Sequence, residues 1–285
     1  MVGTRDAVLY ERAQGSFTYG QLPPRDRDVP RVTLDTGFDM ASCSKVMATT
    51  TAAAVLFQRG LLGLQDPVAQ HLGPAFNANG KEGVRVVHLL THDAGFPPDP
   101  SPGYWEESFG CPETVRHPHA PQLAWDCNAR IFAAVLAQRL DRPPGLQYVY
   151  SDLSFITLHY VVGAVVLARG VPTAPLLPQC AAFDPTSNPG GTYLCHFEAF
   201  VRLLFAQLQM PDTGYLPAKW GAFPPTRNDT WYRHAVSQGT VDDENAYAMG
   251  GVSGERARRV RSSFLLTGAR TRGSLLHGGG HSDAA

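Results

Sequence analysis

The sequence lacks a charge imbalance, because 24 Lys and Arg residues face 25 Asp and Glu residues and leave a formal net charge of −1. Such a balance argues against nucleic acid as the main partner, since that surface needs an excess of positive charge. The chain also lacks a run of about 18 apolar residues, which a membrane-spanning helix requires. Its first residues lack the apolar region and cleavage site of a signal peptide. These absences predict no membrane segment and, by default, a cytoplasmic protein.

Cysteine is scarce, and its spacing does not indicate a metal site. The chain has five cysteines and contains no C-x-x-C or C-x-x-H pattern, the spacings typical of zinc ligands. An odd number without a recognisable framework favours reduced thiols over disulfides. We therefore expect no structural metal and no disulfide framework among Cys43, Cys111, Cys127, Cys180 and Cys195.

Apolar residues are abundant and periodic. They make up 44% of the 285 residues, enough for one sizeable core or for two lobes of one domain. Apolar spacing and segment length predict packed helices over residues 40–60, 128–140, 155–169 and 197–210. Residues 7–20 hold two β-prone segments around a glycine, a pattern typical of a hairpin.

The segment FDMASCSKVMATTTAAAVLF (Phe38–Phe57) has no charged residue except Lys45 after Met40, so a helix here should be buried nearly all round. Residues three apart share a helix face, which places Ser42 beside Lys45. Near a helix N-terminus, backbone N–H groups favour developing negative charge, and a lysine among apolar neighbours loses its proton more easily. The pattern indicates acyl transfer at Ser42; the alternative is a capping serine and a lysine that extends to solvent.

Four segments in order resemble the serine β-lactamase and penicillin-binding-protein superfamily, particularly its class C-like branch, which includes esterases and D-amino-acid peptidases. They are TGFDMASCSKVMATTTAAAVLFQRGLLGLQDPV, VRVVHLLTHDAGFP, YVYSDLSFITLHYVVG and DDENAYAMGGVSG. The resemblance implies an α+β, β-lactamase/transpeptidase-like fold in which a helical lobe is inserted into an antiparallel sheet. We expect the family domain at residues 1–254, with an incomplete sheet, and a poorly ordered Arg-rich tail at residues 255–285.

The resemblance also implies roles for individual residues. Ser42 would be the acylated nucleophile, Lys45 would share its proton, and Tyr150 would act with Lys45 as general base and then as general acid. The second motif is Y-x-N in most relatives, whereas this chain has Asp152 at its third position. An ionised Asp152 only accepts hydrogen bonds, so substrate binding there should disfavour lactams and peptides. It should also favour the charged form of Lys45 and oppose its work as a base.

The remaining polar residues give weaker indications of a functional site. His88 and His92 lack a third ligand at a useful spacing, so we expect no metal there and expect His92 to bond local backbone. The acidic run Asp242–Glu244 is expected to be a solvated loop near the cleft. The third motif of the family, K-T-G or H-x-G, is imitated only by His277 and its two following glycines.

These observations predict a serine hydrolase that forms an acyl-enzyme on Ser42, uses no cofactor and acts on a small ester, amide or lactam. The first alternative is a catalytically impaired homologue that binds peptides or partner proteins. The second is a surface protein without any site. If the sheet is incomplete, the apolar face of the helix over Val46–Phe57 should be partly uncovered, which would destabilise the chain.

Overall fold

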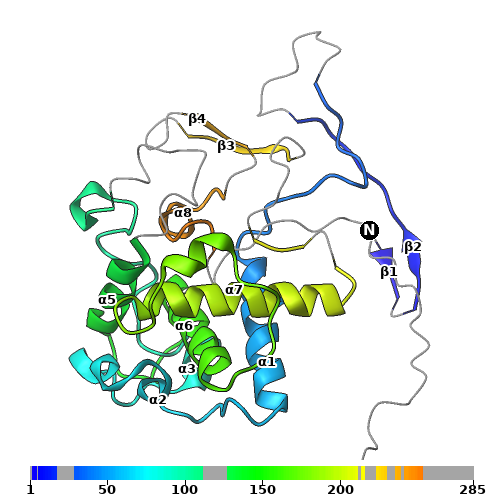
Figure 1. Ribbon diagram of the computed structural model, residues 1–285. Coiled ribbons are helices and arrows are strands. Elements are labelled where there is room, and N and C mark those ends of the chain that lie inside the picture. Colours follow the sequence, from blue (N-terminus) through cyan, green and yellow to red (C-terminus); the bar gives the residue numbers. More distant parts are fainter. Residues whose placement is uncertain are drawn as a thin grey trace, which may run out of the picture.

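The computed structural model describes residues 2–4, 6–17, 29–111, 127–210, 213–215, 223–229, 235–238 and 241–252 (Figure 1). Helices form the main body, and the described strands lie outside it, one pair above and one pair to the right in the view of Figure 1. The predicted tail at residues 255–285, including His277, lies outside the described residues.

In the described part of the chain, the body is built from one π-helix, three 3-10 helices and several α-helices. In chain order these are η1 (Lys45–Thr50), α1 (Thr51–Gln58), α2 (Val68–Leu72), η2 (Pro74–Gly80), α3 (Val86–Leu90), η3 (Glu107–Phe109), α5 (Asn128–Ala137), α6 (Asp152–Ala168), η5 (Pro178–Ala182), α7 (Pro189–Gln207) and α8 (Glu244–Ala248). The four helices predicted from apolar spacing are present with shifted ends. Together with antiparallel strands they give the α+β, β-lactamase/transpeptidase-like fold that the sequence predicts.

Helix α6 lies at the centre of the core. Every residue from Asp152 to Val166 is buried, because the helix is apolar on all sides and is covered all round. Helix α7 crosses it so closely that a Cβ on Gly163 would collide with the carbonyl of Tyr193. A glycine in the middle of this helix is therefore required by the crossing.

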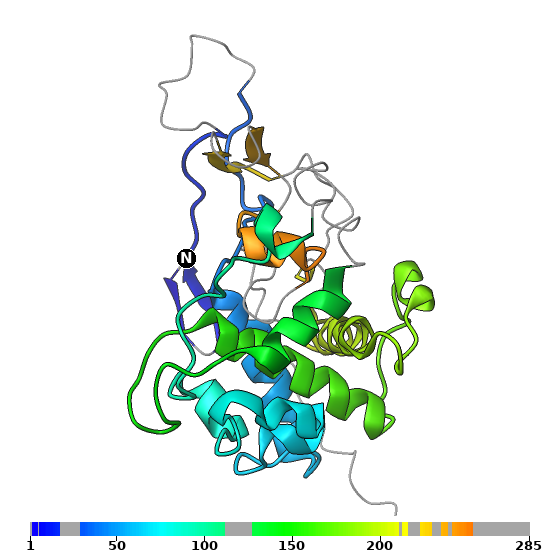
Figure 2. The same ribbon diagram turned by 90° about the vertical axis from the view of Figure 1, so that its left-hand side faces the viewer.

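The strands form two separate antiparallel pairs, β1 (Val2–Gly3) with β2 (Val8–Tyr10) and β3 (Pro225–Asp229) with β4 (Ala235–Gln238). Both views place β3, β4 and α8 on one side of the helical body (Figures 1 and 2). The predicted hairpin over residues 7–20 is wrong in its pairing, because β2 pairs with the segment before it. Strand propensity located β2, but it carries no information about the partner.

The helix after Ser42 begins as a π-helix rather than as a regular α-helix. The hydroxyls of Thr50 and Thr51 donate to the carbonyls of Lys45 and Val46, five residues earlier, and so bond across the widened turn. The expectation of burial all round is wrong, because Val46 is 66% exposed and Phe57 is 51% exposed. One apolar face of η1 and α1 is thus partly uncovered.

A buried lysine joins η2 to the end of α5. The side chain of Lys81 is fully buried, and its Nζ donates to the carbonyl oxygens of Ala78 at 2.7 Å, Leu136 at 2.9 Å and Gln138 at 2.5 Å. Burial lowers the pKa of Lys81 to about 8. The ammonium group therefore still supplies all three donors at pH 7 and satisfies carbonyls that the helix end leaves open.

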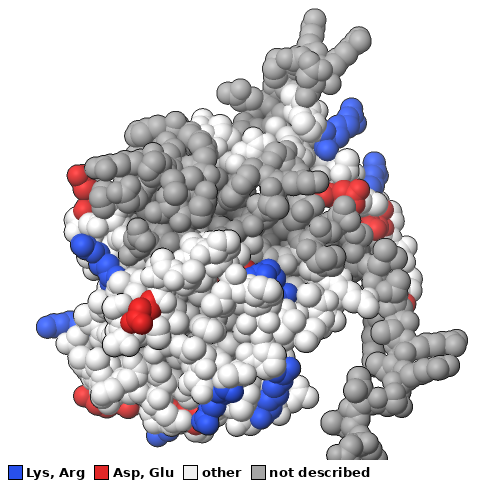
Figure 3. All heavy atoms as spheres, viewed as in Figure 1, with Lys and Arg blue, Asp and Glu red and all other residues white. Residues whose placement is uncertain are grey.

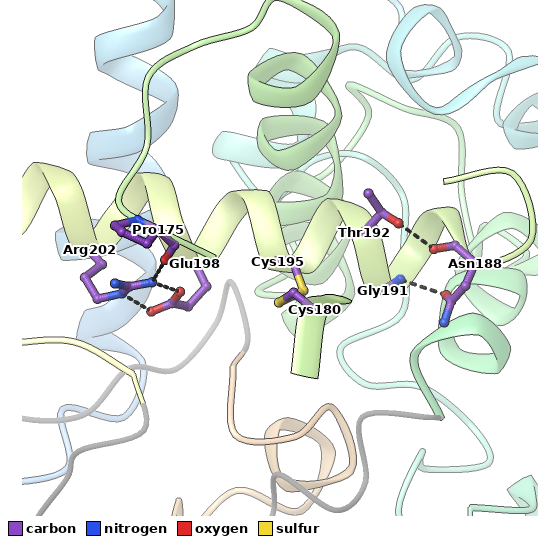
Figure 4. Close-up of a disulfide and its surroundings, with 8 residues drawn as sticks. All are labelled: Pro175, Cys180, Asn188, Gly191, Thr192, Cys195, Glu198 and Arg202. Carbon is purple, nitrogen blue, oxygen red and sulfur yellow. Dashed lines mark hydrogen bonds and ion pairs between the residues drawn. A yellow bond between two sulfur atoms is a disulfide. The ribbon is translucent and has the colours of Figure 1, made fainter. Parts of the chain in front are cut away.

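Two disulfides correct the expectation of reduced thiols. Cys180 in η5 is bonded to Cys195 in α7 (Figure 4), and Cys111 is bonded to Cys127, each pair with Cα atoms 5.9 Å apart. Cys43 is a free, exposed thiol. Sequence spacing does not reveal these pairs because the fold brings the Cα atoms within bridging distance. Disulfides are typical of oxidising compartments, which weakens the default assignment to the cytoplasm.

Charged side chains of the described residues are scattered over the face in Figure 3, without a patch of one sign. In the same part of the chain, no helix is long and apolar enough to span a bilayer.

Candidate active site

Ser42 and Lys45 lie next to each other at the start of the helical segment formed by η1 and α1. Ser42 is in the turn before η1, and Lys45 is the first residue of η1. Lys45 Nζ donates a hydrogen bond to Ser42 Oγ over 3.1 Å. Lys45 is only 3% exposed, so its side chain turns into the protein rather than toward solvent. The arrangement places an amino group beside a hydroxyl that can reach a ligand.

Asp152, at the start of α6, contacts the same amino group of Lys45. Its Oδ1 lies 2.6 Å from Lys45 Nζ, and both side chains are at most 10% exposed. Asp152 is the first residue of α6, which packs against η1. A contact this short favours the ammonium and the carboxylate forms together. In this arrangement, therefore, Lys45 is a hydrogen-bond donor to Ser42.

The aromatic ring of Tyr150 lies next to the amino group of Lys45. The ring centroid is 4.9 Å from Lys45 Nζ, a cation–π distance, and the residue is 44% exposed. Within the described residues its hydroxyl makes no hydrogen bond. The structure thus brings Tyr150 to the site but does not join its oxygen to Lys45 or Ser42.

His92 is a site residue that the sequence reasoning missed. It was expected to bond local backbone, but its Nδ1 accepts the N–H of Ser151 at 3.0 Å, 59 residues later. Its ring also lies against the rings of Tyr150 and Phe155, at centroid distances of 4.6 and 5.0 Å. Burial, and then the charge of Lys45, lower the pKa of His92, while Asp152 raises it. A ring that accepts at Nδ1 is neutral and carries its proton on Nε2.

The loop after His92 holds the start of α6. Ser151 Oγ donates to the carbonyl of Pro97 at 2.6 Å, and the N–H of Asp152 donates to the carbonyl of Pro98 at 2.7 Å. Ser151 Oγ also accepts the N–H of Ser154 and so caps the helix. These bonds fix the position from which Asp152 reaches Lys45.

The turn before Ser42 is strained. Ala41 has a φ of 44°, which costs a residue with a Cβ about 1–2 kcal/mol. Its N–H donates to Asp39 Oδ1 at 2.9 Å, and its carbonyl accepts from Ser44 Oγ at 2.7 Å. A strained residue beside a reactive group is a recurrent feature of functional sites.

The acidic run Asp242–Glu244 is not the solvated loop that the sequence suggested. Asp243 caps α8, because its Oδ1 accepts the N–H of Ala246 at 2.7 Å. Arg227 forms ion pairs with Asp242, at 3.3 Å, and with Glu244. The run is therefore bound into the protein, since two of its three carboxylates pair with one arginine and the third caps a helix.

Among the described side chains, no group of three His, Cys, Asp or Glu residues could hold a metal ion, and His88 and His92 form no such site. The imitation of the third motif at His277 lies outside the described residues.

A sequence model of the family described as Beta-lactamase matches residues 2–172, more than half of the chain. The chain belongs to the Beta-lactamase family. Its matched part contains Ser42, Lys45 and Tyr150, whereas the segment from Asp242 onward lies beyond it.

The individual proteins that the chain resembles share less than 30% of its sequence in the three examples that follow. A putative D-alanyl-D-alanine carboxypeptidase of Salmonella schwarzengrund (strain CVM19633) is 27% identical over 238 residues, which are 79% of this chain and 48% of that protein. Among solved structures, EstCE1, a hydrolase with promiscuous acyltransferase activity, has a TM-score of 0.54 at 21% identity and covers 92% of this chain and 64% of its own. The β-lactamase/D-alanine carboxypeptidase of Yersinia pestis, complexed with citrate, has a TM-score of 0.51 at 18% identity and covers 84% and 54%. The chain thus spans about half the length of the curated relatives it matches.

Proposed function

We propose that this chain is a serine hydrolase that forms a covalent acyl-enzyme on Ser42 and acts on a small ester, amide or lactam. The observation that carries the proposal is the hydrogen bond between Lys45 Nζ and Ser42 Oγ, at 3.1 Å, next to the start of a core helix. Membership in the Beta-lactamase family supports the reaction class. The roles of the individual residues are part of the same proposal.

The acylation step needs a neutral Lys45. In the proposed step, Asp152 first takes a proton from the ammonium group, which its 2.6 Å contact allows. The free amine of Lys45 then takes the proton of Ser42 as Oγ attacks the substrate carbonyl and the carbonyl bond becomes a tetrahedral oxyanion. Collapse of this intermediate expels the leaving group, which receives a proton. Water then hydrolyses the acyl-enzyme and restores Ser42.

Tyr150 is the proposed donor of the proton to the leaving group. Its ring lies over Lys45 Nζ, and its exposed position leaves the hydroxyl accessible to a bound substrate. Proton transfer from such a group typically contributes about 10²–10⁴-fold to the rate.

Asp152 sets the proposed substrate class. Its carboxylate accepts hydrogen bonds but does not donate them, and it repels a substrate carboxylate close to the scissile bond. Short neutral esters therefore fit the site better than penicillins or acyl-D-Ala peptides.

A catalytically impaired binding protein is the second candidate, and one observation favours it. The buried ion pair between Lys45 and Asp152 holds the lysine in the form that cannot act as a base. If Asp152 does not take a proton from Lys45 when substrate binds, Lys45 stays an ammonium group, and the site would hold a ligand without acylation.

A fluorophosphonate probe followed by mass mapping separates the two candidates. The proposal expects one covalent adduct on Ser42, loss of the adduct in Ser42→Ala, and a free energy of unfolding within about 2 kcal/mol of the parent. Lys45→Ala should also abolish labelling. A folded protein that takes no label would support the binding protein, and labelling of Ser42→Ala at the full rate would refute the site.

A further inference from the structure

Asp39 binds the peptide that precedes the proposed nucleophile. Its Oδ1 accepts the N–H of Ala41 at 2.9 Å, while Ser44 Oγ donates to the carbonyl of the same residue at 2.7 Å. Ala41 lies in the left-handed region, with a φ of 44°, where residues with a Cβ are uncommon. Two side chains thus hold a conformation that an alanine does not favour by itself.

The second oxygen of Asp39 reaches a distant segment. Asp39 Oδ2 accepts the N–H of Asp242 at 3.2 Å, across 203 residues of sequence. That segment is anchored again three residues later, because Asn245 Oδ1 accepts the buried N–H of Tyr104 at 2.8 Å. One carboxylate therefore joins the turn before Ser42 to the segment that leads into α8.

We infer that Asp39 is a positioning residue that keeps Ala41 left-handed and thereby holds Ser42 Oγ within hydrogen-bond distance of Lys45 Nζ. The inference rests on the proposed function, in which Ser42 is acylated. Asp39 acts through the backbone, because a change of φ at Ala41 redirects the chain as it enters Ser42. Nothing in this role requires Asp39 to touch the substrate.

The first test compares Asp39→Ala with Asp39→Asn in the rate of fluorophosphonate labelling at Ser42. Asp39→Ala removes both acceptor oxygens and should lower the rate on the order of 10- to 100-fold, as small misplacements of reacting groups do. Asp39→Asn keeps one acceptor for the N–H of Ala41 and should stay within about threefold of the parent. A loss in Asp39→Asn as large as in Asp39→Ala would show that charge, and not the hold on Ala41, is what matters.

The second test repeats Asp39→Ala in an Ala41→Gly background. Glycine adopts positive φ about as readily as negative φ, so the turn then needs less support. The loss caused by Asp39→Ala, measured against Ala41→Gly alone, should shrink at least severalfold. An equal loss in both backgrounds would overturn the inference.

A third readout does not depend on Ser42 reactivity. Cys43 is exposed in the same turn, and the other four cysteines form the two disulfides, so iodoacetamide under non-reducing conditions reports on this turn. Asp39→Ala should change the alkylation rate of Cys43 severalfold, whereas Asp39→Asn should not. If the parent takes no label on Ser42, the proposed function fails and this measurement alone decides about Asp39. An unchanged alkylation rate in Asp39→Ala overturns the inference in every case.

Discussion

Lys45 Nζ lies 2.6 Å from Asp152 Oδ1 and 3.1 Å from Ser42 Oγ, so one amino group joins the carboxylate of α6 to the hydroxyl before η1. A buried pair of this kind is costly to break from one side, because the partner is left as an unpaired buried charge. The pair therefore governs both the protonation state of the lysine and the affinity of the site for charged ligands.

Asp152→Asn should shift substrate preference toward lactams. The amide keeps a hydrogen-bond acceptor, adds a donor for a substrate carbonyl and removes the charge that holds Lys45 protonated. The ratio of turnover for a chromogenic cephalosporin to that for a neutral nitrophenyl ester should rise about tenfold or more, the effect of about 1.4 kcal/mol. A parent protein that already turns over the cephalosporin faster would contradict the proposed role of Asp152.

Lys81→Met should lower the free energy of unfolding by about 2–4 kcal/mol. The substitution keeps the apolar stem but leaves three buried carbonyl oxygens without their donor, and each unsatisfied group costs about 1–3 kcal/mol. Urea denaturation at pH 7 measures the change. Glu82→Gln, at the exposed neighbouring position, is the matched control and should change stability by less than about 0.5 kcal/mol. A neutral Lys81→Met would mean that these carbonyls find other donors.

Acidification should destabilise the fold through His159. Burial lowers the pKa of this fully buried histidine to about 3, so the unfolded chain takes up its proton near pH 6.5 while the folded chain stays neutral. Stability should therefore fall as pH drops below about 6.5, by about 1.4 kcal/mol per pH unit for this group. His159→Phe should flatten the slope between pH 6.5 and 5. Part of the slope should remain, because burial also lowers the pKa of His71, His92 and His196.

Replacing Cys180 and Cys195 together by alanine should lower the free energy of unfolding by about 3 kcal/mol. The bridge closes a segment of 15 residues, and this is the loop entropy that such a cross-link removes from the unfolded chain. Thermal unfolding of parent and double variant, each with and without reductant, measures the effect. Reductant should still destabilise the double variant, because the Cys111–Cys127 bridge remains. Equal stability of parent and double variant would mean that the bridge adds nothing to the fold.

The sequence was sufficient to locate the helices and the Ser42–Lys45 pair because both depend on local spacing. Apolar periodicity determines which segments form helices, and residues three apart also meet in the turn before η1, where the N–H of Lys45 donates to the carbonyl of Ser42 at 3.1 Å. Helix ends were less certain: α6 begins at Asp152 rather than at Phe155, since Ser151 supplies the cap. The family resemblance then added Tyr150, whose place beside Lys45 depends on residues more than 100 positions apart.

Long-range contacts could not be predicted. The bond from the N–H of Ser151 to His92, the bond from the N–H of Asp242 to Asp39 and both disulfides join residues between 15 and 203 positions apart, and no local pattern marks them. The pairing of β2 failed for the same reason. In each case the residue has no distinguishing sequence context, and its partner is determined by how the helices and loops pack.

The close crossing of α6 and α7 at Gly163 also bears on the ion pair between Asp152 and Lys45. Asp152 lies on the same helix, eleven residues from Gly163, which corresponds to about 16 Å along the axis. A larger residue at position 163 would push α6 away from α7, and a tilt of a few degrees over that length would displace the Asp152 carboxylate by about 1 Å, enough to alter its 2.6 Å contact with Lys45. The geometry of the ion pair therefore depends in part on the absence of a side chain at a position remote from it.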